Sequence, residues 1–292
     1  MPQLAMANRP SVSILLPVLA PHPIYFRQAV ESILGQSYAD FELLVVEDPS
    51  PNLAATTLAD YLDPRIRHIR NPERTGLVDQ LNQGLAVARG ELVARMDADD
   101  VSEPDRLELQ CSLFAERRDI AVAGSQLRII DWRGKHCGYR AYPLTPQAIR
   151  MALPRYNPLA HPSVMYRREI VAAAGGYRYR KYPANEDYEL WSRLAVQGQR
   201  FANDPRPLLR YRIHPGAMKA TRLHGIIRGT LEVKQHYWRD KMSLADRVRL
   251  AGERCLLAMP PRIVMELFKR TAYRSELPAL SVNDRSIETS DS

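Results

Sequence analysis

Short apolar runs alternate with segments of helical periodicity over residues 11–125, and this alternation limits the fold more than any other feature. Buried strands are predicted at 12–16, 43–46, 65–69, 91–96 and 120–123. Helices are predicted between them, around 26–34, 53–62, 77–88 and 107–114. Such an order favours an α/β fold with a mostly parallel, Rossmann-like sheet flanked by helices.

Polar or turn-forming residues follow three of these strands directly. Pro17 ends the first strand, Glu47 and Asp48 end the second, and Asp97–Ala98–Asp99–Asp100 ends the fourth. Ligands of open parallel sheets bind beyond the carboxyl ends of the strands. We therefore expect these three segments to meet at one ligand-binding edge.

The acidic loop 97–100 predicts a Mg²⁺ or Mn²⁺ site, because hard cations prefer oxygen ligands and share them with substrate phosphates. An EF-hand loop starting at Asp97 would need glycine where Ser102 stands, and Pro104 would begin a helix inside it. A solvated or helix-capping acidic loop remains open as the simpler alternative.

The sequence lacks the motifs that identify several other classes of protein. The first strand is not followed by G-x-G-x-x-G, and there is no Walker motif and no G-x-S-x-G. A nucleotidyltransferase needs a glycine-rich basic loop there, and residues 17–23 contain no glycine. The chain has a net charge of +8, but its basic stretch lacks the clustered aromatic residues that are typical of nucleic-acid-binding proteins. This argues against a nucleic-acid partner.

The second half of the chain has a different pattern. Residues 126–215 indicate mixed α+β structure, and residues after 221 are helical and basic, with twelve Lys/Arg against five Asp/Glu in 222–274. We predict boundaries at 1–125, at 126–220, and at 221–292 for a helical extension with a disordered tail. The basic helices are candidates for an anionic membrane surface, for packing on the domain, or for a dimer contact.

No secretory leader or bilayer-length apolar run is evident, so we expect a cytoplasmic protein, at most peripheral at the inner face of the membrane. Three widely spaced cysteines do not suggest a disulfide framework or a thiolate zinc site.

With these features in place, the chain resembles family 2 of inverting glycosyltransferases, which have the GT-A fold, in the form found in bacterial surface-glycan synthesis. The resemblance covers about residues 11–215 in the expected order. The matching segments are VSILLPV at 12–18, AVESILGQS at 29–37, FELLVVEDPS at 41–50, GELVARMDADD at 90–100, PDRLE at 104–108, HPSVMYRR at 161–168, GGY at 175–177, EDYELW at 186–191 and YRIH at 211–214.

The resemblance implies that 1–125 is the nucleotide-sugar-binding half of a GT-A domain, which holds the donor site, and that 126–220 is its acceptor-binding half. Pro17 and Val18 would line the nucleotide pocket through their backbone, and Asp48 would accept a hydrogen bond from the base. Glu47 stands where many relatives have a first Asp, and Asp97 would meet the ribose or the base side of the donor.

The same resemblance assigns the metal to Asp99 with Asp100 in support, next to Ala98 of the donor loop, and makes His214 a candidate metal or diphosphate contact. Arg74, which precedes Gly76, could meet the diphosphate as a fixed cation. A solvated loop arginine is the equally open alternative for Arg74.

Asp187 is implied as the general base, with Glu186 as the second choice. Asn185–Glu186–Asp187 would open a helix, whose dipole favours an ionised carboxylate. The spacing alone also suits a carboxylate that only compensates the helix dipole.

The implied activity is metal-dependent transfer, with inversion, of a hexosyl or N-acetylhexosaminyl group. The donor would be a nucleotide-diphosphate sugar, with uridine favoured, and the acceptor a hydroxyl of a glycan or lipid-linked glycan in surface polysaccharide or lipopolysaccharide synthesis. The chain departs from the family pattern at Leu19–Ala20 and at Pro49, where glycine is common. A non-catalytic scaffold that binds sugar nucleotides is the alternative.

Overall fold

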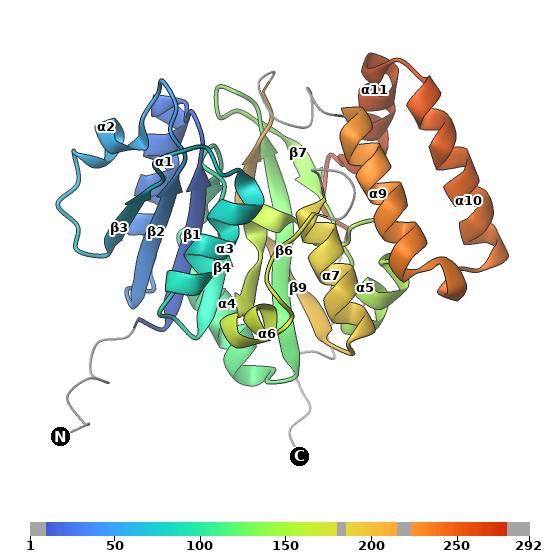
Figure 1. The fold of residues 1–292 in the computed structure, drawn as a ribbon, viewed down its shortest axis with the longest axis horizontal. Helices are drawn as coiled ribbons and strands as arrows, with labels where there is room; N and C mark the ends of the chain where they lie inside the picture. Colours follow the sequence, from blue (N-terminus) through green and yellow to red (C-terminus); the bar gives the residue numbers. More distant parts are fainter. Residues whose placement is uncertain (1–9, 180–184, 215–222, 279–292) are drawn as a thin grey trace. The chain divides into compact units, whose positions relative to one another are not determined.

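The computed structural model describes residues 10–179, 185–214 and 223–278, which are coloured in Figure 1. The chain forms two compact units, one made of 1–122 with 161–178 and the other of 123–160 with 179–292. The disordered tail expected from the sequence falls mostly on 279–292, which lies outside the described residues.

The first unit is built from alternating strands and short helices. Its elements are β1 (Val12–Val18), α1 (Pro23–Leu34), β2 (Phe41–Glu47), α2 (Ala54–Leu58), β3 (Ile66–Arg70), α3 (Leu77–Val87), β4 (Leu92–Arg95), β5 (Val101–Ser102), α4 (Arg106–Glu116), η1 (His161–Ser163), β8 (Met165–Arg167) and α6 (Arg168–Ala173). Strand β6 (Ile120–Ile130) begins in this unit and continues into the second.

Apart from β5, the strands that lie wholly in this unit follow the order β3-β2-β1-β4-β8. β1 pairs in parallel with β2 and β4, and β2 pairs in parallel with β3, which confirms the predicted mostly parallel sheet. β8 pairs antiparallel with β4, with Val93 opposite Tyr166. This pairing explains why 161–178 belongs to the first unit although 123–160 does not.

The core of the sheet follows from the apolar runs in the sequence. All seven residues of β1 and all seven of β2 are buried. α3 packs on β1 and β2 through Leu81 and Leu85. Gly90 allows the chain entering β4 to approach β1, because a Cβ there would lie 2.6 Å from the backbone nitrogen of Ser13.

The second unit carries the remaining elements. They are the rest of β6, β7 (His136–Arg140), α5 (Pro146–Ala152), α7 (Glu186–Val196), β9 (Arg200–Arg212), α9 (Leu223–Tyr237), η2 (Arg239–Lys241), α10 (Leu244–Cys255), η3 (Leu256–Ala258) and α11 (Pro261–Ala272). β6 pairs antiparallel with β7 and is also a neighbour of β9.

The C-terminal helices are part of the second unit rather than an appendage beside it. α9 packs along α7, as Figure 1 shows, and Trp238 just after α9 is buried and donates its Nε1–H to Ser192 Oγ at 3.0 Å. The predicted helical pattern after residue 221 is confirmed by α9, α10 and α11. Over the described ranges, none of the helices combines the length and the apolarity that crossing a bilayer would require.

Candidate functional site

The carboxyl ends of β1, β2 and β4 bring the expected donor residues to one edge of the first unit's sheet. Val18 is in register with Glu47, and Leu15 with Arg95, so the residues that follow these strands emerge at the same edge. A hydrogen bond of 3.0 Å from Met96 N–H to the Leu15 carbonyl continues the pairing past β4. The acidic loop therefore starts at a fixed place.

Three carboxylates meet in this loop. Oxygens of Asp97, Asp99 and Asp100 all lie within 4.8 Å of one another, with Asp100 buried and the other two half-buried. Oxygens bound to one Mg²⁺ or Mn²⁺ are at most about 4.2 Å apart, since each metal–oxygen bond is about 2.1 Å. A small rotation of one carboxylate would suffice, so the cluster fits a hard divalent cation.

Two arginines lie beside the acidic loop. Both belong to motif segments of the sequence, but the motifs gave neither of them a role. Arg95 is buried and forms an ion pair with Asp97. Arg106, fully enclosed, donates to the Arg95 carbonyl at 2.8 Å and to the Val164 carbonyl at 3.3 Å. Burial lowers the pKa of Arg106 to about 9, a shift that attraction to Asp100 opposes and that repulsion from Arg95 adds to.

Asp48, predicted to contact the donor base, is fully buried and holds the loop that follows β3. Its Oδ1 accepts from Asn71 Nδ2 and Thr75 Oγ1, each at 2.8 Å. Its Oδ2 accepts from the backbone N–H of Thr75 at 3.1 Å and of Gly76 at 2.7 Å. Burial alone would raise the pKa of Asp48, but the bonds from Asn71, Gly76 and Thr75 outweigh burial and hold it below its ordinary value.

This loop carries Arg74 to the start of α3. Gly76 has φ +94°, a conformation that residues with a Cβ rarely adopt, and it is the N-cap of α3. Asp48 thus serves as the acceptor for an N–H at the helix start, where a carboxylate is favoured by the helix dipole. Arg74 is exposed on this anchored loop, which is compatible with the predicted diphosphate contact.

Glu47 has a different environment from the one its place in the motif suggests. Its side chain is buried, with Oε1 accepting from Ala54 N–H at 2.5 Å and Oε2 lying 2.8 Å from His68 Nε2. Both oxygens are therefore engaged in positioning α2 and β3. A contact of Glu47 with the donor stays a prediction, and it would have to coexist with these bonds.

The backbone expected to line the nucleotide pocket is tied to α3. Pro17 and Val18 are buried in β1. The Val18 carbonyl accepts from Asp48 N–H at 3.0 Å and from Gln80 Nε2 at 2.8 Å, and Gln80 also donates to the Val46 carbonyl at 2.9 Å. Gln80, which the sequence analysis did not single out, links the ends of β1 and β2.

The candidate general base lies in the second unit, in the first turn of α7. Asp187 is half-buried; its Oδ2 accepts from Asn157 Nδ2 at 2.7 Å and its Oδ1 from the Tyr188 N–H at 2.7 Å. Two donors thus fix the orientation of the carboxylate. Glu186 beside it is buried.

The start of α7 is itself held in an uncommon conformation. Asn185, the N-cap residue, has φ +61°, which asparagine tolerates better than most residues. Its amide donates to the Ile226 carbonyl at 2.7 Å and accepts from Thr230 Oγ1 at 3.3 Å. α9 therefore determines how α7 begins, and with it the place of Asp187.

His214 also belongs to the second unit. It follows β9 by two residues and is half-buried, and the preceding Ile213 N–H donates to the Ile130 carbonyl at 2.9 Å. Its predicted contact with a metal or diphosphate stays a prediction.

Comparison with known proteins adds to this geometry. The model of a family described as "Glycosyl transferase family 2" matches residues 13–174, more than half of the chain. The chain belongs to this family. The matched segment of this family 2 glycosyltransferase includes β1, the Asp48 network and the acidic loop.

Two of the relatives are named for a biosynthetic role. An O-antigen biosynthesis glycosyltransferase of Escherichia coli is 33% identical over 65% of this chain and 75% of its own. An amylovoran biosynthesis glycosyltransferase of Erwinia amylovora is 28% identical over 85% of this chain and 94% of its own.

Solved structures of low identity establish the fold. Staphylococcus aureus TarS 1–349, crystallised with UDP-GlcNAc, matches with a TM-score of 0.63 at 14% identity, over 82% of this chain and 70% of its own. A mannosyltransferase of Pyrobaculum calidifontis, in complex with GDP-Man and Mn²⁺, matches with a TM-score of 0.61 at 16% identity, over 96% and 79%. The predicted GT-A fold is confirmed by these matches.

Proposed function

We propose that this family 2 glycosyltransferase transfers a sugar, with inversion, from a nucleotide-diphosphate sugar to a hydroxyl of a glycan or lipid-linked glycan. The observation that carries the proposal is the cluster of Asp97, Asp99 and Asp100 at the same sheet edge as the Asp48-anchored loop. A uridine donor carrying a hexosyl or N-acetylhexosaminyl group is our first choice.

The first unit would bind the donor. Pro17 and Val18 would face the nucleotide, and Asp97 and Ala98 would lie along the ribose and the first phosphate. Arg74 would meet the diphosphate, and its loop is already anchored by the four hydrogen bonds to Asp48. An anchored cation costs less ordering free energy on binding than a free one.

A divalent cation, Mn²⁺ or Mg²⁺, would be held by Asp99 and Asp100, with His214 as a further candidate ligand. When bound, the cation neutralises charge that develops on the departing diphosphate. Asp97 is paired with Arg95, and Asp99 is half-buried at the same sheet edge, which supports Asp99 as the carboxylate that faces the diphosphate through the metal.

Asp187 would act as the base. Its carboxylate takes the proton of the acceptor hydroxyl as that oxygen forms a bond to the anomeric carbon. The bond from that carbon to the diphosphate oxygen breaks on the opposite face, and the nucleoside diphosphate leaves with the electron pair. The hydrogen bonds from Asn157 and from the Tyr188 N–H would keep the carboxylate aimed. Glu186 is the second choice.

The biological setting we propose is synthesis of a surface polysaccharide or lipopolysaccharide on the cytoplasmic side of the membrane. This proposal is supported by the relatives named for O-antigen and amylovoran biosynthesis. The alignment with this chain covers most of the length of each relative.

The test measures nucleotide release from a panel of UDP-, dTDP- and GDP-sugars without acceptor, with Mn²⁺, with Mg²⁺ and with EDTA. We compare the wild type with Asp99→Ala, Asp187→Asn and the control Asp60→Ala, whose carboxylate is exposed and paired with Arg27. We expect metal-dependent release from one donor, lost in Asp99→Ala and kept in Asp60→Ala. With an acceptor, Asp187→Asn should lower kcat about 10²–10⁴-fold while donor binding persists.

Two results would contradict the proposal in different ways. Saturable donor binding without turnover on any glycan acceptor would favour the non-catalytic scaffold. No saturable binding of any donor would remove the role given to every residue of the site.

A further inference from the structure

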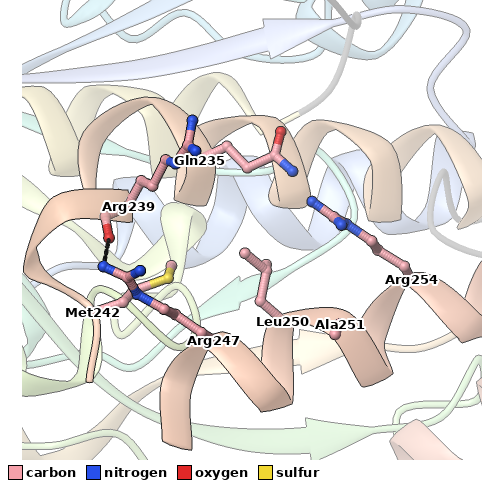
Figure 2. Close-up of a pocket in the computed structure, with 7 residues that line it drawn as sticks. All are labelled: Gln235, Arg239, Met242, Arg247, Leu250, Ala251 and Arg254. Atoms are coloured by element: carbon pink, nitrogen blue, oxygen red, sulfur yellow. Dashed lines mark hydrogen bonds between the residues drawn. The ribbon is translucent and has the colours of Figure 1, made fainter. Parts of the chain in front are cut away.

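A basic pocket of about 390 Å³ opens in the second unit between α9, η2 and α10, and none of its lining residues is assigned to the site above (Figure 2). Its lining comes from three arginines, one glutamine and three apolar residues: Gln235, Arg239, Met242, Arg247, Leu250, Ala251 and Arg254. Figure 2 shows the three guanidinium groups arranged around it. None of these seven described lining residues is acidic, so the pocket suits an anion.

The two acidic residues of α10 are paired with basic residues outside the pocket, and Asp240 of η2 is not among the residues that line it. Glu253 of α10 binds Lys234 Nζ at 2.6 Å and Arg249 Nε at 3.3 Å. Asp246 binds Arg155 Nε at 2.7 Å and closes the capping box of α10 with Ser243. The pocket arginines are therefore left without a neutralising acid from these residues.

The guanidinium groups that line the pocket form few hydrogen bonds or ion pairs with the described residues. Arg247 Nη2 reaches only the Arg239 carbonyl, at 3.5 Å, as the dashed line in Figure 2 shows. Within 10–179, 185–214 and 223–278, neither Arg239 nor Arg254 has an ion-pair partner. Guanidinium groups offer several donors in a plane and match phosphate oxygens well.

The walls of the pocket are held together, so it is a built feature. Lys234, on α9, is buried, and its ion pair with Glu253 joins α9 to α10. Met242, at the end of η2, is buried and forms an apolar part of the lining.

An exposed apolar ridge adjoins the pocket on α10. Leu244 is 79% exposed and Val248 65% exposed, one helical turn apart. Because successive residues turn by about 100° around a helix, this pair lies on the flank next to the stripe of Arg247, Leu250 and Arg254. α10 has no buried residue of its own.

We propose that this pocket binds the phosphate headgroup of an anionic phospholipid, with Leu244 and Val248 inserted beside it, so that α10 rests on an anionic bilayer. A soluble phosphate compound would engage the arginines but leave the apolar ridge in water. A lipid satisfies both, because its headgroup is anionic and its chains are apolar. The proposal does not depend on the assigned transferase activity.

The test is flotation of the full-length protein with vesicles of phosphatidylcholine, alone and mixed with phosphatidylglycerol. We compare the wild type with Arg247→Gln/Arg254→Gln and with Leu244→Ser/Val248→Ser. The control is Arg228→Gln/Arg262→Gln, which removes the same charge from exposed positions of α9 and α11 outside the pocket.

We expect the wild type to float only with phosphatidylglycerol vesicles. The pocket pair should weaken the partition constant about thirtyfold, since each Lys or Arg at an anionic surface contributes about fivefold. The ridge pair should weaken it as well, and the control pair by less than about fivefold.

Three outcomes would overturn the proposal. Equal losses for the pocket and control pairs would mean diffuse charge attraction. Binding of inorganic phosphate or glycerol phosphate without any vesicle flotation would mean a soluble anion site. Sedimentation showing a dimer that Leu244→Ser/Val248→Ser dissociates would mean that a second copy of the chain covers this face. Donor hydrolysis measured in parallel reports on the transferase assignment separately.

Discussion

At the scale of single residues, Asp48 illustrates how a motif carboxylate can act on a ligand through other groups. Its oxygens accept four hydrogen bonds from Asn71, Thr75 and Gly76, and its side chain is inaccessible to solvent. Its first effect is therefore to fix the loop with Arg74 and the start of α3. Any contact with a nucleotide base would add to that task.

Replacing Asp48 with asparagine tests this task. An asparagine amide has one acceptor oxygen and one NH2 donor where the carboxylate has two acceptor oxygens, so at least one of the four donors would lose its acceptor. We expect Asp48→Asn to lower the free energy of unfolding by about 1–3 kcal/mol. It should also weaken donor binding, because the Arg74 loop loses its anchor. Urea unfolding and calorimetric titration with UDP measure the two effects.

Asp60→Asn is the matched control for this change. Its carboxylate is exposed and paired with Arg27, so its unfolding free energy should stay within about 0.5 kcal/mol of the wild type. Unchanged donor affinity in Asp48→Asn would show that the loop does not bind donor.

Sequence reasoning could locate the site carboxylates but not their partners. Asp97, Asp99 and Asp100 were placed correctly at a strand end because a parallel sheet brings such ends to one edge. The bonds of Asp48 depend on where a loop more than twenty residues later returns, and apolar periodicity carries no signal for that return.

At the scale of elements, a polar network links the opposite, amino-terminal ends of the strands. Glu42, buried in β2, accepts from Ser13 Oγ at 2.7 Å and from Arg67 Nη1 at 2.6 Å, and it also binds Arg89. Burial would raise the pKa of Glu42, but the bonds from Ser13, Arg67 and Arg89 outweigh it, so the pKa lies below its ordinary value. The ionised form thus stabilises the junction of β1, β2 and β3.

Glu42 should make the stability depend on pH in the acid range. A carboxyl whose pKa is lower in the folded than in the unfolded state stabilises fully above the unfolded value. That stabilisation is lost as the pH falls through the folded value. We therefore expect the unfolding free energy to fall below about pH 4.3, the ordinary value for glutamate, and to fall less steeply in Glu42→Gln. Urea titrations across this range measure both slopes.

Glu169→Gln provides the control, since the Glu169 side chain is exposed and its ion pair with Arg168 is long, at 4.0 Å. It should keep the acid slope of the wild type. Parallel slopes in Glu42→Gln and the wild type would show that Glu42 keeps the same pKa when the chain unfolds.

The elements of the second unit were less predictable, for a physical reason. The prediction 120–123 recovered only the start of β6, which extends to Ile130 through Ser125 and Gln126. Gln126 can be buried because its amide is paired with the backbone of Tyr142. Gln126 Oε1 accepts from the Tyr142 N–H at 2.6 Å, and Gln126 Nε2 donates to the Tyr142 carbonyl at 3.1 Å. β9 likewise contains buried Asn203 and Asp204, so neither strand shows simple apolar alternation.

At the scale of the whole molecule, the C-terminal segment divides into two functions. α9 supports the helix that carries the candidate base. Asn185 at the start of α7 bonds the Ile226 carbonyl and Thr230 of α9, and Tyr237 at the end of α9 donates to Glu189 of α7 at 2.5 Å. α10 carries the basic pocket and contributes no buried residue. Truncation before α9 would remove both, which is why point variants are the proper test of membrane binding.

Trp238 gives the sharpest test of the structural part. It is buried, and its Nε1–H bonds Ser192 in the middle of α7. Trp238→Ala should lower the free energy of unfolding by about 3–5 kcal/mol, because it leaves a large cavity and an unpaired hydroxyl. It should also lower kcat, since α7 loses the support that positions Asp187. Trp132→Ala, at an exposed tryptophan of the same unit, should change stability by less than about 0.5 kcal/mol and leave kcat unchanged. A full kcat in Trp238→Ala, despite reduced stability, would show that α9 does not position the residue that takes the acceptor's proton.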